Sequence, residues 1–536
     1  MSLRAWLRGP LLGAGLCLAT VSAAVKLAAA QCPLIYGETQ FPDAFEPVTT
    51  LNNMPAVRVS ALLFASLVRF DEFREAQPCL AESWTLLPGG RQIRFRLRPG
   101  LVWHDGQPLQ ASDVKFTLDL FRRTDSFIGP YYRHKAQAFL GATVLGDLEI
   151  EFEFVQPAPT EAEALSRCRF PILPEHVLRG PGLKRASSFS TQKPVGSGPY
   201  YLAEIAVAEN RVTLHANPRY FARPQIEEIV MRKRANQELL TLALQGGGLD
   251  FIADISPNRL QPFYRSVEFE IYPFESLSFE GLGLNLANKH LANPAVRQAL
   301  LYGTDRQRIL DEVYDGRGQL LSGPFAPTSY CFCDTVAPYP YQPSRARQLL
   351  TAAGYADRDG DGILESPLGS RLSFVLKVAA HDDASSDYVV CQRISSYLRE
   401  VGIQVEVAKM TRDDFEYAVH RKRDFDMAFF AWAYDEGSNV GPLFITDRDF
   451  PEFDKNYGGY QNPQFEAIYQ AWVQAADRIT AQAYGWEMHR ILAADLPYLF
   501  LWHLEKYAIA TRALRSVSLS TLTTFDFVEN WAKECE

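Results

Sequence analysis

Hydrophobic and polar positions in the first third of the chain follow mainly a strand pattern. Between residues 80 and 155, two apolar-rich runs flank a Pro-Gly-Gly turn, and a later run alternates acidic and apolar residues with a period of two. The expected strands are Ser83–Leu87, Gln92–Leu97 and Glu149–Phe154, and the expected helix is Asp113–Arg123 with Ser112 as its N-cap. The pattern therefore predicts a β-rich unit.

The second half of the chain alternates predicted strands with predicted helices. Several helix starts carry capping residues, and Gly354 is placed to end one of the helices. The expected helices begin at Asn293-Pro294, Thr304 and Thr411 and span Ser344–Ala353 and Asp382–Glu400, and the expected strands are Arg371–Ala379, Ile403–Ala408 and Met427–Tyr434. This alternation favours a parallel sheet covered on both faces, hence an α/β lobe.

The first thirty residues have the pattern of a secretory signal peptide. Arg4 and Arg8 precede an apolar run from Leu11 to Val25, and Ala28-Ala29-Ala30 supplies a small-residue cleavage site. The run is short for a bilayer span, so an uncleaved anchor is the weaker alternative. We expect residues 1–30 to be removed and the mature chain to be periplasmic, without membrane insertion.

Composition and charge narrow the class of protein. The chain has 536 residues, 47% of them hydrophobic, and a formal charge of −9, which is typical of a globular protein with an acidic surface. Removal of the basic signal peptide makes the mature chain more acidic still. Such a charge argues against nucleic acid and anionic membranes as partners.

Seven of the eight cysteines remain after cleavage, because Cys17 lies in the signal peptide. An odd number in an exported protein leaves at least one thiol free or paired between chains, and the sequence does not give the pairing. Cys331 and Cys333 are spaced like a metal-binding pair, but no histidine lies in the same segment, so a disulfide or buried thiols are favoured.

A series of short motifs resembles the solute-binding family of oligopeptide-, dipeptide- and nickel-binding importer components. The motifs follow the family's order over roughly residues 34 to 515. They are Pro78–Trp84, Phe95–Gly100, His104–Leu109, Ser112–Val114, Gly196–Tyr200, Asn217–Phe221, Asn285, Val296–Leu300 with Asp305-Arg306, and Ala346–Gly354.

This resemblance implies a two-lobed periplasmic-binding-protein (Venus-flytrap) α/β fold with an extra β-rich subdomain. Its domain I is discontinuous, domain II is the β-rich insertion, and domain III is the α/β lobe. The expected ranges are 31–60, 190–281 and 496–536 for domain I, 61–189 for domain II, and 282–495 for domain III. The ligand is expected in the cleft between domains I and III, which close over it.

The implied function is that of the substrate-binding component of an ABC transporter. Such a protein captures peptides or similar small polar solutes and delivers them to permease and ATPase subunits, and it requires no cofactor. We expect a monomer that undergoes hinge closure. The alternatives are binding of a metal chelate, such as one of nickel, and a sensory or chaperone role on the same fold.

An enzyme is the main rival class. The sequence has no G-x-S-x-G elbow, H-E-x-x-H zinc helix or P-loop, and its nine histidines are scattered singly. A secreted hydrolase is therefore disfavoured, and no catalytic residue is predicted.

The segment from Asp357 to Glu365 matches the first half of a calcium loop. Asp357, Asp359 and Asp361 have the spacing of carboxylate ligands for a hard cation. The glutamate expected at the twelfth position is replaced by Leu368, for which Glu365 is a partial substitute. Aspartate and glycine also make surface turns, so calcium and a plain turn both remain open.

Asp435 is the predicted ligand anchor. It directly follows the apolar strand that ends at Tyr434, and ligands of open parallel sheets bind at the carboxyl ends of strands. The segment Trp432–Asp435 is similar to the family's tryptophan-x-x-aspartate, whose carboxylate holds the ammonium of peptide ligands. The next residues, Glu436–Asn439, depart from the family pattern and leave the ligand's identity open. Asp435 as a simple cap is the alternative.

Overall fold

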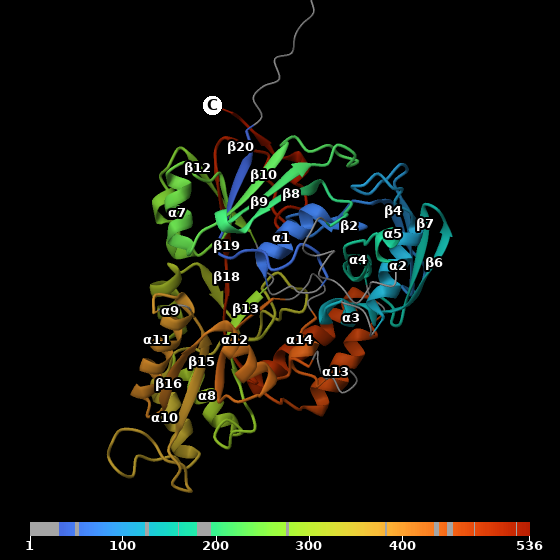
Figure 1. The fold of residues 1–536 in the computed structure, drawn as a ribbon. Coiled ribbons are helices and arrows are strands. Elements are labelled where there is room, and N and C mark those ends of the chain that lie inside the picture. Colours follow the sequence, from blue (N-terminus) through green and yellow to red (C-terminus); the bar gives the residue numbers. More distant parts are fainter. Residues whose placement is uncertain are drawn as a thin grey trace, which may run out of the picture.

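The computed structural model describes residues 32–48, 53–123, 128–158, 160–179, 194–274, 278–380, 383–433, 439–446, 454–475, 477–520 and 523–535. The predicted signal peptide lies outside these residues. In Figure 1 the chain forms an upper lobe, a sheet-and-helix unit at its side, and a lower lobe, and the C-terminus lies on the upper lobe.

A mixed seven-stranded sheet organises the upper lobe, with α1 (Met54–Leu63) and α7 (Gln237–Gln245) beside it. The central strand β1 runs parallel to both of its neighbours, and the outer pairs are antiparallel. In spatial order the strands are β12 (Phe269–Phe274), β19 (Lys506–Thr511), β11 (Phe251–Ile255), β1 (Leu34–Glu38), β10 (Glu228–Lys233), β9 (Arg211–Ala216) and β8 (Tyr200–Ala206).

The unit at the side is an antiparallel four-stranded sheet packed with helices. Alternate residues of its strands are buried, as in β7, where Ile150, Phe152 and Phe154 point into the core. The strands are β4 (Ala81–Leu86), β5 (Gln92–Leu97), β7 (Glu149–Phe154) and β6 (Phe139–Gly146), and the helices are α2 (Ala111–Phe121), α3 (Pro130–Ala136), α4 (Glu161–Cys168) and α5 (Glu175–Leu178). The predicted β-rich unit is confirmed, but α2 begins earlier than expected, with Gln110 rather than Ser112 as its N-cap.

A six-stranded sheet organises the lower lobe. Its strands, in spatial order, are β14 (Gly318–Leu320), β18 (Tyr498–Leu504), β13 (Ser278–Leu284), β17 (Met427–Ala433), β15 (Ser373–Ala379) and β16 (Gln404–Met410). Its helices are α8 (Pro294–Tyr302), α9 (Arg306–Tyr314), α10 (Pro343–Ala352), α11 (Ser386–Glu400), α12 (Arg412–Phe415), α13 (Pro463–Val473) and α14 (Arg478–Asp495). The predicted α/β alternation is confirmed, and β15 is parallel to β16 and β17.

The capping residues of the lower-lobe helices were predicted with mixed success. Asn293 and Thr411 cap α8 and α12 as expected, because their side chains accept backbone N–H groups of the first turn. Asp305, not Thr304, caps α9, since its carboxylate accepts the N–H of Arg308. A carboxylate one residue later accepts hydrogen bonds from the same free N–H groups, and its negative charge is also stabilised by the positive end of the helix dipole.

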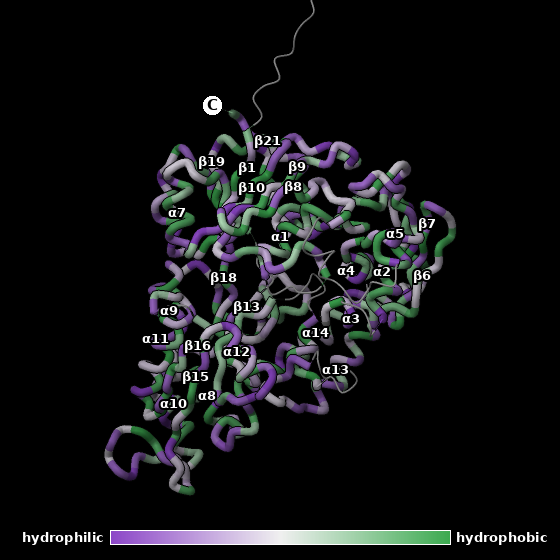
Figure 2. Tube along the Cα trace, viewed as in Figure 1, coloured by the Kyte–Doolittle hydropathy of each residue, from purple (hydrophilic) through white to green (hydrophobic). Residues whose placement is uncertain are grey.

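Short two-stranded sheets, β2 (Val68–Phe70) with β3 (Ala76–Pro78) and β20 (Leu514–Arg515) with β21 (Ala532–Lys533), complete the upper lobe. The upper lobe and the four-stranded unit share one large hydrophobic core, a smaller cluster packs α7 against the upper sheet, and the lower lobe has a core of its own. Figure 2 shows the hydrophobic segments concentrated on the inner strands of each lobe. Because the lower-lobe core is separate from the others and few segments join the lobes, the lobes can move as units.

The chain passes between the two large sheets twice. β12 and β19 pair antiparallel in the upper sheet, and β13 and β18 pair antiparallel in the lower sheet. β13 follows β12 and β18 precedes β19 along the chain, so the same two segments pair with each other in the upper sheet and again in the lower sheet (Figure 1). β13 begins before residue 282 and β18 lies wholly after residue 495, yet both pair in the six-stranded sheet. The predicted domain limits stay a prediction.

Candidate ligand-binding site

The carboxyl end of β17 is the place where the sequence predicts the ligand. Trp432 is half-buried near the end of this strand, whereas Asp435 lies outside the described residues. The parallel strands β15 and β16 end at the same edge of the sheet, which is where α/β sheets expose loop residues to ligands. The role of Asp435 thus stays a prediction.

Trp432 belongs to a stack of aromatic rings on one face of the sheet. Its ring lies 5.1 Å from that of Phe430 and 6.1 Å from that of Tyr457, both nearly parallel to it. The ammonium of Lys455 lies 5.6 Å from the Trp432 ring, within the range of a cation–π contact. A flat aromatic surface of this kind can pack against an apolar or cationic group.

His420 closes the other end of the stack, with its ring 4.5 Å from that of Tyr457. Burial, together with the positive charges of Arg412 and Lys455, lowers the pKa of His420 to about 4. The imidazole is therefore neutral at pH 7, and it acts as an aromatic spacer rather than as a charge.

The opposite face of the same strands holds a carboxylate that the sequence analysis missed. Glu280 of β13 lies directly across from Trp502 of β18, whose indole N–H donates to Glu280 Oε2 at 2.7 Å. The hydroxyl of Tyr314 donates to the same oxygen at 3.4 Å. The signal available in the sequence was a single acid in an otherwise uncharged strand, Ser278–Leu284.

The junction between the lobes carries several polar contacts. Arg317, between α9 and β14 in the lower lobe, donates to the hydroxyls of Tyr264 (3.2 Å) and Tyr507 (3.4 Å) of the upper lobe. Lys506, the first residue of β19, pairs with Asp254 at 3.1 Å. The Lys506–Asp254 pair lies within the upper lobe, whereas the partly exposed Arg317 contacts link the lower lobe to the upper one.

The predicted calcium ligands are partly gathered in one place. The carboxylates of Asp357, Asp359 and Asp361 are exposed, and each offers an oxygen within 4.8 Å of the others. Glu365 instead accepts the backbone N–H of Arg358 at 2.8 Å, so its carboxylate is engaged in the turn. Asp361 also pairs with Arg371. Calcium at this loop stays a prediction.

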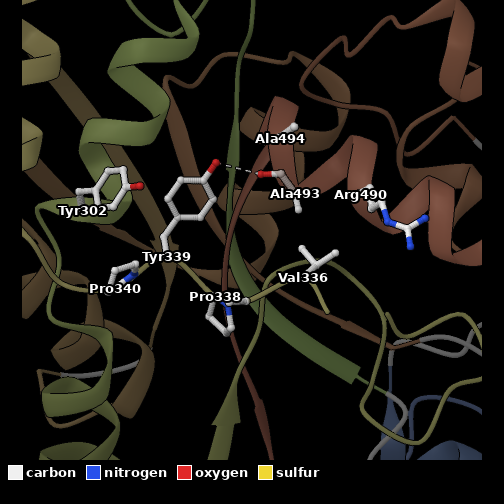
Figure 3. Close-up of a pocket in the computed structure, with 9 residues that line it drawn as sticks. Tyr302, Val336, Pro338, Tyr339, Pro340, Arg490, Ala493 and Ala494 are labelled. Carbon is white, nitrogen blue, oxygen red and sulfur yellow. Dashed lines mark hydrogen bonds between the residues drawn. The ribbon is translucent and has the colours of Figure 1, made fainter. Parts of the chain in front are cut away.

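A separate open pocket of about 390 Å³ lies on the lower lobe between the segment from Val336 to Pro340 and α14. Figure 3 shows Tyr302, Tyr339 and Arg490 around it, with the Tyr339 hydroxyl donating to the carbonyl of Ala493. Its lining is largely apolar and does not include Trp432.

The serine and histidine pair Ser322–His489 has the wrong hydrogen-bonding arrangement for a nucleophile and its base. Cys333 N–H donates to His489 Nδ1 at 2.9 Å, so the ring proton sits on Nε2, which lies 2.9 Å from Ser322 Oγ. A ring that donates to the serine does not accept its proton. His489 is fully buried, which lowers its pKa to about 4. It is a structural histidine.

The structure shows which of the seven cysteines that follow the signal peptide are paired and which are free. Cys32 and Cys535 form a disulfide that joins the two ends of the described chain. The remaining five, including Cys331 and Cys333, are free and buried. Among the described residues, only the exposed aspartates of the 357–361 loop have metal-ligating atoms grouped together, so Cys331 and Cys333 do not form a metal site there.

No helix in the described part of the chain is long and apolar enough to cross a membrane.

Comparison with known proteins matches residues 75–448 to the family described as bacterial extracellular solute-binding proteins, family 5 Middle. The oligopeptide-binding protein AppA of Bacillus subtilis is 24% identical over 508 residues, which cover 93% of this chain and 91% of AppA. The glutathione-binding protein GsiB of Pectobacterium atrosepticum is 24% identical over 88% of each chain.

Solved structures share the fold over nearly the whole chain. AppA from Bacillus subtilis, solved in complex with a nonapeptide, superposes with a TM-score of 0.82 at 24% identity and covers 94% of this chain and 99% of its own. NikZ from Campylobacter jejuni, in complex with Ni(L-His), gives a TM-score of 0.81 at 23% identity with the same coverage. The predicted two-lobed α/β fold is confirmed.

Proposed function

We propose that this chain, which belongs to the bacterial extracellular solute-binding proteins of family 5, captures peptides or similar small polar solutes between its lobes for an ABC importer. The observation that carries the proposal is the pair of neighbouring crossings, β12–β13 and β18–β19, between two lobes with separate cores. A ligand that contacts both lobes binds the closed form best and therefore shifts the population toward it.

Peptides are the favoured ligand class. The relatives named above include an oligopeptide-binding and a glutathione-binding protein. In this chain Asp435 is the proposed anchor for the ligand's ammonium, and the nearby Trp432 ring provides an apolar wall. A carboxylate in a closed, water-poor site makes strong charge-assisted hydrogen bonds to an ammonium.

A metal chelate is the second candidate ligand, favoured by the structural likeness to NikZ with Ni(L-His). The described part of the lobe junction offers tyrosines, carboxylates and arginines rather than grouped histidines or cysteines. A chelate would therefore be recognised through its organic part.

The protein acts without changing its ligand, as a periplasmic monomer exported by its signal peptide. The energy for transport comes from the ATPase subunits of the importer, to whose permease the closed protein delivers the ligand. In the buried Ser322–His489 pair, the imidazole carries its proton on the nitrogen that faces the serine, so it is not placed to act as a base. This arrangement is consistent with a binding role rather than hydrolysis.

Mass spectrometry of the ligand released by denaturing the purified protein tests this function. Peptides, bound again on adding them back, are the expected result, and they should be recovered unchanged after long incubation. Release of a nickel or iron chelate instead of peptides would show that the second candidate ligand is the correct one. Recovery of cleaved peptides would contradict the binding-only role.

A further inference from the structure

A tight turn after α9 carries Arg317 of the lower lobe to the junction between the lobes. Asp315, the C-cap of α9, and Gly316 both have left-handed backbones, with φ of 54° and 71°. Glycine adopts this conformation freely, and aspartate is among the few other residues that adopt it readily. The N–H of Gly316 donates to the carbonyl of Leu310, and the N–H of the next residue donates to that of Tyr314. These bonds tie the turn to the helix, so the lower lobe fixes the backbone of Arg317.

The strand that follows this turn places Arg317 opposite the residue at which the chain crosses between the lobes. β14 pairs antiparallel with β18, and Gly318 lies across from Leu504. Extending this register by one residue puts Arg317 across from Glu505, the single residue between β18 and β19. In agreement with that position, Arg317 Nη1 lies 4.0 Å from Glu505 Oε2. The guanidinium therefore lies beside one of the two crossings.

Two tyrosines of the upper lobe contact the guanidinium of Arg317. Nη2 donates to the hydroxyl of Tyr264 at 3.2 Å, and Nη1 donates to the hydroxyl of Tyr507 at 3.4 Å. The guanidinium carbon also lies 5.5 Å and 5.9 Å from the centres of these two rings, within the range of cation–π contacts. Tyr507 is buried in the cluster beneath α7, whereas Tyr264 is exposed and follows the short helix η3 (Gln261–Phe263). One side chain of the lower lobe thus contacts two separate segments of the upper lobe.

The contacts of Arg317 differ in how a rotation of the lobes affects them. Glu505 lies at the crossing itself, and the hydroxyl of Tyr507, two residues further on, donates to the Glu505 carboxylate. Burial raises the pKa of Tyr507 to about 12, so this hydroxyl keeps its proton at neutral pH. Tyr264 lies outside both crossing segments. Because atoms near a rotation axis move least, a rotation about Glu505 changes the distance from Arg317 to Tyr264 most.

We propose that Arg317 and Tyr264 form a latch between the lobes, which holds the ligand-free protein in the lobe arrangement of this structure. This inference rests on the function proposed above, because a latch matters only in a protein whose lobes move. The contacts of Arg317 are partly exposed and individually weak. Open and closed forms are close in free energy, however, so contacts present in only one form change their populations several-fold. The latch thereby sets the closed fraction before a ligand arrives, and with it the apparent affinity.

Small-angle X-ray scattering of the ligand-free protein tests the latch. Arg317→Met keeps a long side chain but removes all contacts of the guanidinium. Tyr264→Phe removes only the hydroxyl of an exposed side chain, so this variant should fold normally. Both substitutions should change the radius of gyration in the same direction, and Arg317→Met should change it more. Arg265→Met is the matched control, because Arg265 is exposed next to Tyr264, and it should leave the radius unchanged.

Peptide affinity provides a second readout that is linked to the first. The probes are alanine peptides of two to nine residues, and calorimetry follows the one that binds the wild-type protein best. Because a ligand binds the closed form best, a variant with a larger radius of gyration should bind this peptide about threefold more weakly. A variant with a smaller radius should bind it about threefold more tightly. A residue that only stabilised the fold would not move the radius and the affinity together.

The outcomes separate the latch from the proposed function. An unchanged radius of gyration in both Arg317→Met and Tyr264→Phe would overturn the latch and leave the function intact. A change of equal size in Arg265→Met would overturn it as well, because the effect would then not depend on the contacts of Arg317. Failure of every peptide to bind would contradict the proposed peptide ligands, while the scattering of the ligand-free variants would still decide the latch.

Discussion

Arg306 illustrates how a single buried charge holds the lower lobe together. Its side chain is only 2% exposed, and it donates to the backbone carbonyls of Leu321, Phe500 and Tyr339. Burial lowers the pKa of Arg306 to about 10, so it remains charged at neutral pH. One guanidinium thus ties β18 to the two loops around it.

Replacing Arg306 should destabilise the lower lobe strongly. Arg306→Met leaves three buried carbonyls without donors, and we expect the free energy of unfolding to fall by about 3–5 kcal/mol. Urea denaturation followed by fluorescence measures this change. Arg308→Met, two residues away on an exposed side chain paired with Glu312, should cost less than about 1 kcal/mol. Equal losses in the two variants would contradict this account.

Asp435 carries the most specific prediction at the residue scale. Asp435→Ala should weaken the binding of an amine-bearing peptide at least tenfold, about 1.4 kcal/mol, because the ligand's ammonium is left buried without its counter-charge. Calorimetry with the co-purified ligand measures it, and exposed Asp334→Ala is the control. Unchanged affinity in a folded Asp435→Ala protein would make Asp435 only a cap.

At the scale of elements, periodicity predicted most of the lower-lobe strands and helices. Local patterns were sufficient for β15 and α10, because one face of each packs on the core, and for β17, because its first four residues form a continuous buried apolar run. They were not sufficient for β13 and β18, since pairing between strands more than two hundred residues apart depends on the whole fold. Glu280 was missed for the same reason: its partners Trp502 and Tyr314 meet it only in the folded sheet.

The loop at Asp357 gives a prediction for one element. If its three aspartates bind calcium, the ion offsets their mutual repulsion, and calcium should raise the melting temperature of the protein. Differential scanning fluorimetry with calcium, magnesium or chelator measures the shift. Asp359→Ala should abolish the gain. Identical melting curves with calcium and with chelator would mean that the segment is only a turn.

At the scale of the whole molecule, the two lobes are joined in a way that permits closure. The disulfide Cys32–Cys535 holds the ends of the chain together within the upper lobe, so it does not restrain the lower lobe. Only the β12–β13 and β18–β19 crossings continue directly between the two large sheets in the described chain. Glu505, the single residue between β18 and β19, is therefore a natural point of bending.

Small-angle X-ray scattering tests the central claim, which is that a ligand closes the two lobes. The measurement compares the protein stripped of ligand by partial unfolding and refolding with the same sample after its co-purified ligand is restored. Calorimetry on both samples establishes whether the site is occupied. We predict a smaller radius of gyration in the ligand-bound sample. An identical radius of gyration with the site shown to be full would contradict capture by closure.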